Sequence, residues 1–356
     1  MLDVFQRWYQ RKFSDPDAVM LLLLILVSSI ALVFWGEMMM PVIVSAVIAY
    51  LLDWPVVRLQ KVGVNRTLAT AIVLMLFVSF VIVTLVGFLP VISKQSVNLL
   101  QEMPQIATSA QEWIRTLPEK YPSYINVTQV ADFIDSLNEK ASVLGESLIA
   151  VSFNTLGNVA ALLIYMILVP LMVFFMLKDK DFFLNAVSSL LPNERRLIAQ
   201  VGNEMNGQIA NYIRGKVIEI FIVGGVSYIT FALMDLRYAM LLGALVGLSV
   251  LIPYIGAAVV TIPVAMVALF QWGISPQFGY LMFAYGIIQA LDGNLLVPIL
   301  FSEAVSLHPL YIIVAVLFFG GLWGFWGVFF AIPLATLVKA LITAWSSESS
   351  AELKDN

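Results

Sequence analysis

The 356-residue chain contains no cysteine and a single histidine. Without cysteine it has no disulfide, no thiolate metal ligand and no thiol nucleophile, and one histidine cannot form a histidine-based metal cluster. It also lacks the HExxH motif and the paired intramembrane aspartates of membrane proteases. The net charge of −4 gives no reason to expect nucleic acid as a partner. We therefore expect no enzyme, no metal and no cofactor.

Charged side chains are scarce, at 12% of the residues, whereas 61% of the residues are hydrophobic. Soluble domains carry roughly 25% charged residues. The apolar residues are gathered in runs long enough to cross a lipid bilayer. The sequence therefore predicts an all-α fold, namely a polytopic helical membrane protein surrounded by lipid. We count about eight spans, including two helical hairpins broken by glycine and proline, and a small extracytoplasmic helical region.

Cations in the loops give the orientation of the chain. The leader 1–17 and the loop 53–66 carry matching sets of Lys and Arg, and the loop 178–216 carries six more. Because such cations stay in the cytoplasm, we expect both termini to be cytoplasmic. The predicted division is a cytoplasmic leader (1–17), three spans (18–90), the extracytoplasmic region (91–155), a span (156–177), a cytoplasmic amphipathic loop (178–216), a C-terminal core with the broken hairpins (217–345) and a disordered tail (346–356).

Two boundaries inside these regions rest on local signals. Gly36-Glu37 is predicted to turn the chain between the first two spans, and the third span is predicted to end at Pro90. Residues 91–150 are punctuated by prolines and have apolar residues at helical spacing, which fits either surface helices or a solvated linker. Residues 194–215 are predicted to form an amphipathic helix that precedes a separate span over 217–234. Asp235 and Arg237 are expected to neutralise each other after that span.

Two long apolar segments near the C-terminus are interrupted in the middle. Residues 239–272 would make a helix of about 50 Å, although one crossing needs about 30 Å. Pro253, Tyr254 and Gly256 lie at the centre of this segment, where we expect a hairpin or two half-helices. Residues 310–345 repeat the design, with glycines at 320, 321, 324 and 327. Such pairs of interrupted segments point to a transporter binding site, or else to two tightly packed hairpins without a transport role.

Polar side chains lie between the two interrupted segments. Gln289, Asp292 and Asn294 fall in one predicted span, and ionisable groups in a span are functional candidates by default. Glu303 and His308 follow in a short loop; His308 fits a loop anchor bonded to backbone or a proton relay. Glu219, near the start of the preceding span, fits an interfacial carboxylate or the mouth of a pathway. The candidate pathway residues are Asp292, Gln289, Asn294, Pro253, Tyr254, Gly256, Gly321, Gly324, Glu303, His308 and Glu219.

Several motifs occur in a recognisable order along the chain. They are Val169-Pro170-Leu171, Asn211-Tyr212-Ile213-Arg214-Gly215-Lys216, Ile252-Pro253-Tyr254-Ile255-Gly256, the stretch 288–298, Leu307-His308-Pro309-Leu310, Gly320-Gly321-Leu322-Trp323-Gly324 and Ala331-Ile332-Pro333-Leu334-Ala335. Together they resemble the autoinducer-2 exporter family of bacterial inner-membrane proteins, most closely its PerM-type permeases, nearly from end to end. The resemblance implies eight spans, homo-oligomers, and export of autoinducer-2 or exchange of sodium or lithium for protons. Many family members carry Glu where this chain has Asp292, which keeps a titratable group there.

We therefore expect an inner-membrane secondary transporter or permease that exports a small solute or exchanges a monovalent cation for a proton. Asp292 is the expected cation or proton site, Gln289 and Asn294 supply hydrogen bonds, and the helix breaks present helix ends to the solute. The alternative is a non-transporting membrane scaffold or regulator that acts through the surfaces of 91–150 and 194–215.

Overall fold

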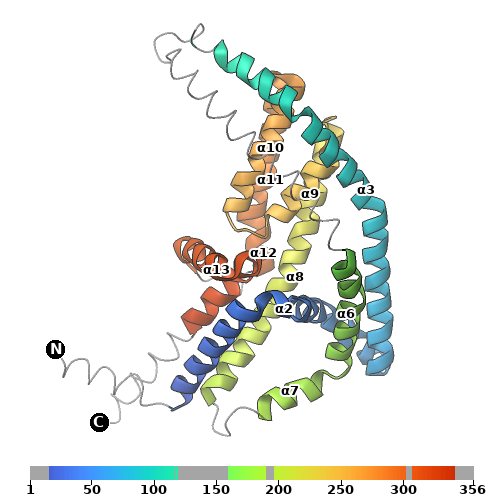
Figure 1. Ribbon diagram of the computed structural model, residues 1–356, viewed down its shortest axis with the longest axis vertical. Coiled ribbons are helices and arrows are strands. Elements are labelled where there is room, and N and C mark those ends of the chain that lie inside the picture. Colours follow the sequence, from blue (N-terminus) through green and yellow to red (C-terminus); the bar gives the residue numbers. More distant parts are fainter. Residues whose placement is uncertain (1–15, 117, 119–158, 190–195, 302–306, 341–356) are drawn as a thin grey trace, which may run out of the picture.

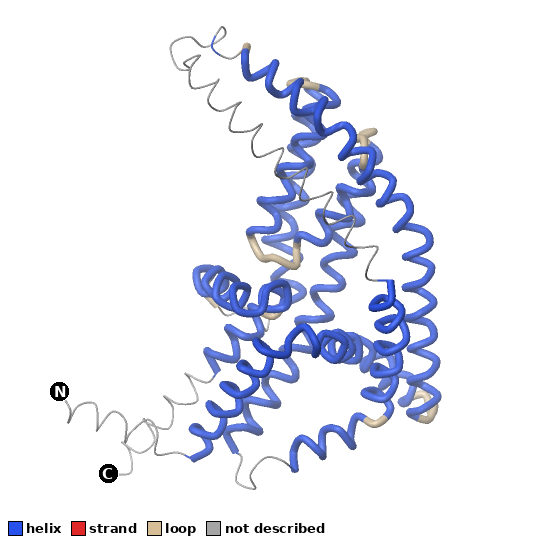
Figure 2. Tube along the Cα trace, in the orientation of Figure 1, coloured by secondary structure: helices blue, strands red, loops and turns tan. Residues whose placement is uncertain are grey.

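The described part of the chain is almost entirely helical. The structure, a computed structural model, describes residues 16–116, 118, 159–189, 196–301 and 307–340, and no strand occurs among them (Figures 1 and 2). Six of these helices are long and apolar enough to cross a membrane, and three shorter apolar helices accompany them. This confirms the predicted polytopic helical membrane fold. Most of the leader, the whole region 119–155 and the C-terminal tail lie outside the described residues.

The first two described helices are longer than the sequence suggested. Helix α2 (Pro16–Lys61) continues through Gly36 and Glu37, so the turn predicted there is wrong. Helix α3 (Arg66–Arg115) contains both Pro90 and Pro104, so the helix does not end at Pro90, where the sequence predicted the end of a span. A proline removes one hydrogen bond and bends a helix, but apolar helix-forming residues on both sides can keep the helix going. Figure 1 shows α3 as a long curved rod along one side of the molecule.

Helices α2, α3 and α6 (Val159–Lys178) pack together in the lower half of Figure 1. Their shared core is apolar and includes Val56, Ala69, Val173 and Leu177. Helix α7 (Lys180–Ser189) follows after one residue. The lysine that opens α7, Lys180, reaches Asp53 of α2 at 2.9 Å, and Arg66 of α3 lies 3.7 Å from the same carboxylate. One aspartate therefore ties three helices together at this end of the molecule.

Helix α8 (Arg196–Leu233) runs through the centre of the molecule. The sequence predicted an amphipathic helix followed by a separate span, but the two segments form one continuous helix. Gly215 lies at the expected boundary and does not break the helix; instead the ring of Phe301 packs over it, so closely that an added Cβ would lie 2.5 Å from a ring carbon. The predicted apolar side is buried at Val201, Met205, Tyr212 and Ile213.

The C-terminal half wraps around α8. It consists of α9 (Ala239–Ser249), α10 (Ile255–Trp272), α11 (Pro276–Leu291), the π-helix η1 (Asp292–Leu296), α12 (Val297–Phe301), α13 (Pro309–Phe329) and the helix Ala331–Ala340. One core joins α8 to α9, α10 and α11 and contains Phe231, Leu242, Val264 and Leu281. A second core joins α8 to α12, α13 and the last helix and contains Tyr212, Phe301 and Phe329.

Polar contacts fasten the far half of α3 to the turn between α8 and α9. The Gln95 side chain of α3 accepts a hydrogen bond from the Leu241 N–H, one of the free donors in the first turn of α9. Arg237 forms an ion pair with Glu102 of α3. The expected Asp235–Arg237 pair is therefore wrong, and the Asp235 carbonyl instead accepts a hydrogen bond from the Gln271 side chain. These contacts hold α3 against the C-terminal half.

Candidate functional site

The first interrupted segment folds into a helical hairpin, which confirms the predicted break. Helices α9 and α10 are its arms, and residues 250–254 form the first tip, in the middle of the molecule (Figure 1). Tyr254 adopts a left-handed φ of 61°, a rare conformation for a side-chain-bearing residue. Gly256 packs against the end of α9 so tightly that a Cβ would lie 1.8 Å from the Ser249 carbonyl oxygen. Only glycine fits this return.

The second interrupted segment repeats this geometry. Within α13 the chain leaves helical conformation at Gly324, with φ 57° and ψ −134°. Three residues later, a Cβ on Gly327 would lie 1.8 Å from the Phe319 carbonyl oxygen. We call residues 320–327 the second tip. The two hairpins thus share a left-handed residue followed closely by a glycine that packs on the preceding arm, as the sequence pattern indicated.

One face of α8 provides hydrogen-bond donors to both hairpins. The Lys216 ammonium donates to the Val250 carbonyl at 2.7 Å, where the backbone leaves α9. The Tyr212 hydroxyl donates to the Phe329 carbonyl at 2.7 Å. In a regular helix that carbonyl would accept from the N–H four residues later, but Pro333 has none. Because residues four apart lie on the same side of a helix, Tyr212 and Lys216 act from one face of α8.

A buried charge cluster surrounds Lys216. The ammonium lies 2.8 Å from the Glu219 carboxylate, and both side chains are almost fully buried, at 5% and 2% exposure. It also lies 5.3 Å from the centre of the Phe301 ring, within range of a cation–π interaction. The Asp292 carboxylate is close enough to interact electrostatically with both Lys216 and Glu219. With all three groups ionised, the cluster has one negative charge more than it has positive charges.

Asp292 begins the π-helix η1, which follows directly from α11. The Val297 N–H bonds the Asp292 carbonyl five residues back, and Pro298 supplies no N–H to the next carbonyl along. Proline in a helix interior displaces the preceding turn, and π-bulges often occur at functional sites. The Asp292 Oδ1 atom is buried and has no hydrogen-bond partner. Among the predicted polar residues that the structure describes, Glu219 also has a buried carboxylate oxygen without a hydrogen bond, but that oxygen lies 2.8 Å from the Lys216 ammonium.

The remaining predicted residues lie in different surroundings. Gln289 donates to the Tyr285 hydroxyl, which also meets the Thr261 hydroxyl of α10. Asn294 is exposed and donates to the Ala290 carbonyl of the preceding helix, α11. His308 is exposed, and its Nδ1 accepts from the Leu310 N–H as the N-cap of α13, which matches the loop-anchor interpretation.

Tyr254, Gly321 and Gly324 are exposed, whereas Pro253 is half-buried. Glu303 lies outside the described residues. The structure therefore brings Asp292 and Glu219 together around Lys216, which bonds the first tip. Asn294 and His308 bond nearby backbone instead. The sequence analysis did not select Lys216 or Tyr212. The sequence did carry a signal for Lys216, which lies three residues before Glu219 inside an apolar helix, a spacing that favours an ion pair.

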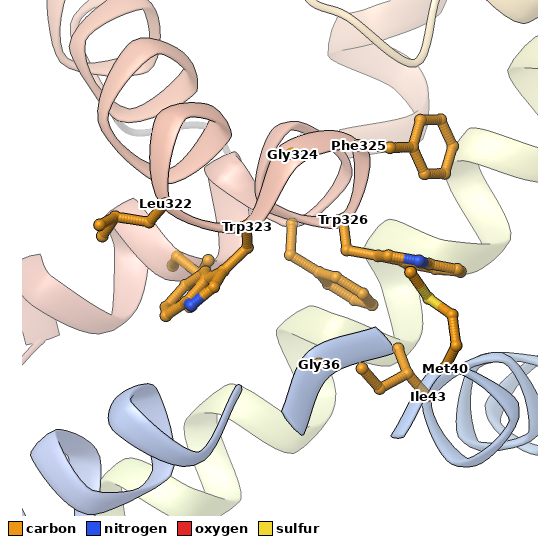
Figure 3. A pocket seen from close by; sticks show the side chains of 10 residues that line it. Gly36, Met40, Ile43, Leu322, Trp323, Gly324, Phe325 and Trp326 are labelled. Atoms are coloured by element: carbon orange, nitrogen blue, oxygen red, sulfur yellow. The ribbon is translucent and has the colours of Figure 1, made fainter. Parts of the chain in front are cut away.

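A cavity of about 580 Å³ lies between the second tip and α2. Trp323 and Trp326 extend from the hairpin toward α2, and Met40 and Ile43 form the opposite wall (Figure 3). The lining side chains are apolar or aromatic, and the two indole N–H groups are their polar atoms. Gly324 contributes to this lining, whereas Asp292, Glu219 and Lys216 do not.

Comparison with known proteins gives one consistent result. The family model described as AI-2E family transporter matches residues 19–347. A protein of Escherichia coli K12 named "Putative permease PerM" is 48% identical over 345 residues, which cover 97% of this chain and 98% of that protein. The "AI-2 transport protein TqsA" of the same organism is 24% identical over 86% of both chains. "Putative transport protein YueF" of Bacillus subtilis is 25% identical over 87% of this chain and 84% of that protein.

Proposed function

Because the chain belongs to the AI-2E transporter family, we propose that it is a secondary transporter of the bacterial inner membrane that couples solute movement to a proton or monovalent cation. The solute is a small molecule moved outward, or a monovalent cation exchanged for a proton. Asp292 is the coupling site in this proposal. Gln289 supports it on the preceding turn of α11, and the two broken hairpins frame the pathway.

One observation carries this proposal: the buried, unpartnered Oδ1 of Asp292 beside the Lys216–Glu219 pair. A charge inside a membrane protein is costly unless it is paired, solvated or neutralised by a bound ion. Lys216 already forms an ion pair with Glu219 and a hydrogen bond with the Val250 carbonyl. A proton or a small cation on Asp292 therefore balances the negative charge of the Asp292 carboxylate. Reversible gain and loss of one positive charge at a buried site is what ion-coupled transport requires.

The experiment uses the purified full-length protein in proteoliposomes that contain a pH-sensitive dye. Sodium, lithium or potassium is added outside to detect exchange for protons, and the efflux of a preloaded organic solute under a proton gradient is measured in parallel. We expect Asp292→Asn to abolish the coupled flux, because the amide cannot carry the exchanged charge. Asp292→Glu keeps a carboxylate and should retain it.

The matched control for this experiment is Asp179→Asn, which alters a half-exposed carboxylate between α6 and α7. This variant should transport like the wild type. Equal coupled flux in wild type and Asp292→Asn would refute the assignment of the coupling site. The absence of any flux of cation, proton or organic solute in the wild type would favour the non-transporting scaffold instead.

The scaffold alternative has less support from the described contacts. One of its proposed surfaces, the apolar side of 194–215, is buried against the protein's own helices at Val201, Met205, Tyr212 and Ile213. We further propose cytoplasmic termini and a homo-oligomer, which reagent access to cysteines placed at the two ends and the mass of the detergent-solubilised particle would test. Basic residues in the last turns of α2 (Arg58 and Lys61) and α6 (Lys178) support the orientation, because cytoplasmic loops are enriched in Lys and Arg.

A further inference from the structure

The Lys216 ammonium makes two close contacts at once. It donates to the Val250 carbonyl of the first tip at 2.7 Å and lies 2.8 Å from Glu219 Oε2. An ammonium has three N–H donors and no acceptor, so it can satisfy only a small number of nearby oxygens. Asp292 is close enough to interact with its charge but has a buried oxygen without a partner. The Val250 carbonyl and the Asp292 carboxylate are thus two alternative partners for the Lys216 ammonium.

The arrangement in the structure corresponds to one charge state of this cluster. The Asp292 side chain is half-buried, and its Oδ1 atom is buried without a partner. An ionised group in such surroundings is disfavoured unless it is paired or neutralised. The observed contacts are therefore those expected when Asp292 is neutralised by a proton or a small cation. In that state the cluster has one lysine and one ionised glutamate, and the ammonium is free to cap the first tip.

We infer that Lys216 is a positioning residue that links the charge of Asp292 to closure of the first tip. When Asp292 releases its proton to water, the new carboxylate attracts the ammonium, which keeps its own charge throughout. Lys216 then exchanges the Val250 carbonyl for the Asp292 carboxylate, and the first tip loses its cap and opens. This inference rests on the proposed function, since it assigns to Lys216 the step between ion binding and movement.

The first tip is suited to respond in this way. The Val250 carbonyl lies at the C-terminal end of α9, where a positive charge is favourable and helical partners are missing. Lys216 and Glu219, both on α8, are charged groups that interact electrostatically with Asp292. Tyr212, on the same face of α8, donates instead to the Phe329 carbonyl of the other hairpin. The charge of Asp292 is thus felt by the residue that caps the first tip.

Because the chain contains no cysteine, a single introduced thiol reports on the first tip without background. Val250→Cys places it at a buried position, 8% exposed, and preserves the backbone carbonyl. Ile274→Cys, 70% exposed in the turn between α10 and α11, is the control. The measurement is the rate of reaction with a small charged thiosulfonate reagent in proteoliposomes, across about pH 5 to 9, a range that covers buried carboxyl groups. Taking the ratio of the two rates removes the common pH dependence of thiol reactivity.

We expect this ratio to rise about tenfold with pH, the change expected for loss of one hydrogen bond from a charged donor. Asp292→Asn should hold the ratio low at every pH, because the residue stays neutral. Lys216→Met should hold it high at every pH, and Lys216→Arg, which keeps the charge, should restore the pH dependence.

A ratio that does not change with pH in the wild type would overturn the inference, and this test needs no variant of the cluster. So would a Lys216→Met protein whose profile follows that of the wild type. Either result combined with loss of flux in Asp292→Asn would leave the proposed function intact and reject only the role of Lys216. Conversely, full flux in Asp292→Asn rejects the coupling site, whatever the labelling shows.

Discussion

The glycines at the two hairpin returns allow a sharp test of the shared geometry. At Gly256 and Gly327, an added Cβ would lie 1.8 Å from the Ser249 and Phe319 carbonyl oxygens, respectively. Carbon and oxygen cannot approach so closely, so the two arms of each hairpin would have to separate by about 1 Å, and overpacking of this kind costs about 3 kcal/mol at the upper end of its usual range. The clashing atoms are backbone on both sides, so rotation of a side chain cannot relieve the contact. We therefore expect Gly256→Ala and Gly327→Ala to destabilise the protein to a similar degree.

The same substitution at open helical sites should have the opposite sign. Gly225 in α8 and Gly279 in α11 have no atom within 4 Å of an added Cβ. There alanine only restricts the unfolded chain and favours helix, which stabilises by up to about 1 kcal/mol. These two variants are matched controls, because each adds the same methyl group to a helix in the same half of the molecule.

The assay is the melting temperature of the detergent-solubilised protein, followed by fluorescence-detected size exclusion after heating. We expect a drop of about 5 °C or more for each hairpin variant and no drop for the controls. If Gly256→Ala and Gly327→Ala melted together with the controls, the close returns would be refuted. A drop at only one of the two positions would contradict the equivalence of the hairpins.

Three further tests address the contacts of α8 and of the turn that follows it. Lys216→Met leaves buried carboxylates without their cation and should destabilise by about 3–5 kcal/mol, whereas adding Glu219→Leu should recover part of the loss in the same melting assay. Tyr212→Phe removes the donor to the second hairpin and should cost about 1–3 kcal/mol; a melting temperature equal to that of the wild type would contradict this bond. Reversing the charge of either Arg237 or Glu102 alone should lower the free energy of unfolding by less than about 1 kcal/mol, because this pair is partly exposed. Reversing both charges together should restore the lost stability, and the loss in the single variants should become smaller at high salt.

The interruptions of the C-terminal helices could be predicted from the sequence because their causes are local. Pro253 has no N–H, and glycines permit the close return and the left-handed backbone, wherever the segment lies in the fold. Asp292 could be selected for a similar reason, since a carboxylate in an apolar segment is rare enough to mark a functional candidate before its neighbours are known. What the sequence alone could not provide is the π-helix that begins at Asp292, because this depends on how the turn before Pro298 is accommodated.

The partners of these residues could not be predicted, because they are far apart in the chain. Lys216 meets a carbonyl 34 residues away, and Tyr212 meets one 117 residues away. No local pattern pairs a lysine with a particular backbone carbonyl. The same reason explains the wrong pairing of Arg237, which bonds a glutamate 135 residues away and not the nearby aspartate. The sequence analysis predicted breaks near Gly36 and Gly215, where the helices are continuous. Glycine permits a turn but does not require one, and contacts with the rest of the fold can keep the residue helical.

The two hairpins look alike in sequence and in backbone, but their caps differ in chemistry, and this difference has a mechanical consequence. A rigid shift of α8 would break the Tyr212 and Lys216 bonds together, since both donors lie on one face of that helix. A change of charge at Asp292 acts on Lys216, whereas the neutral Tyr212 hydroxyl has no net charge for that carboxylate to attract. An electrostatic signal can therefore release the first hairpin while the second remains fastened to α8. If alternating access in this protein requires one hairpin to move against a fixed partner, the chemistry of these caps assigns the moving part to α9 and α10 and the fixed part to α13.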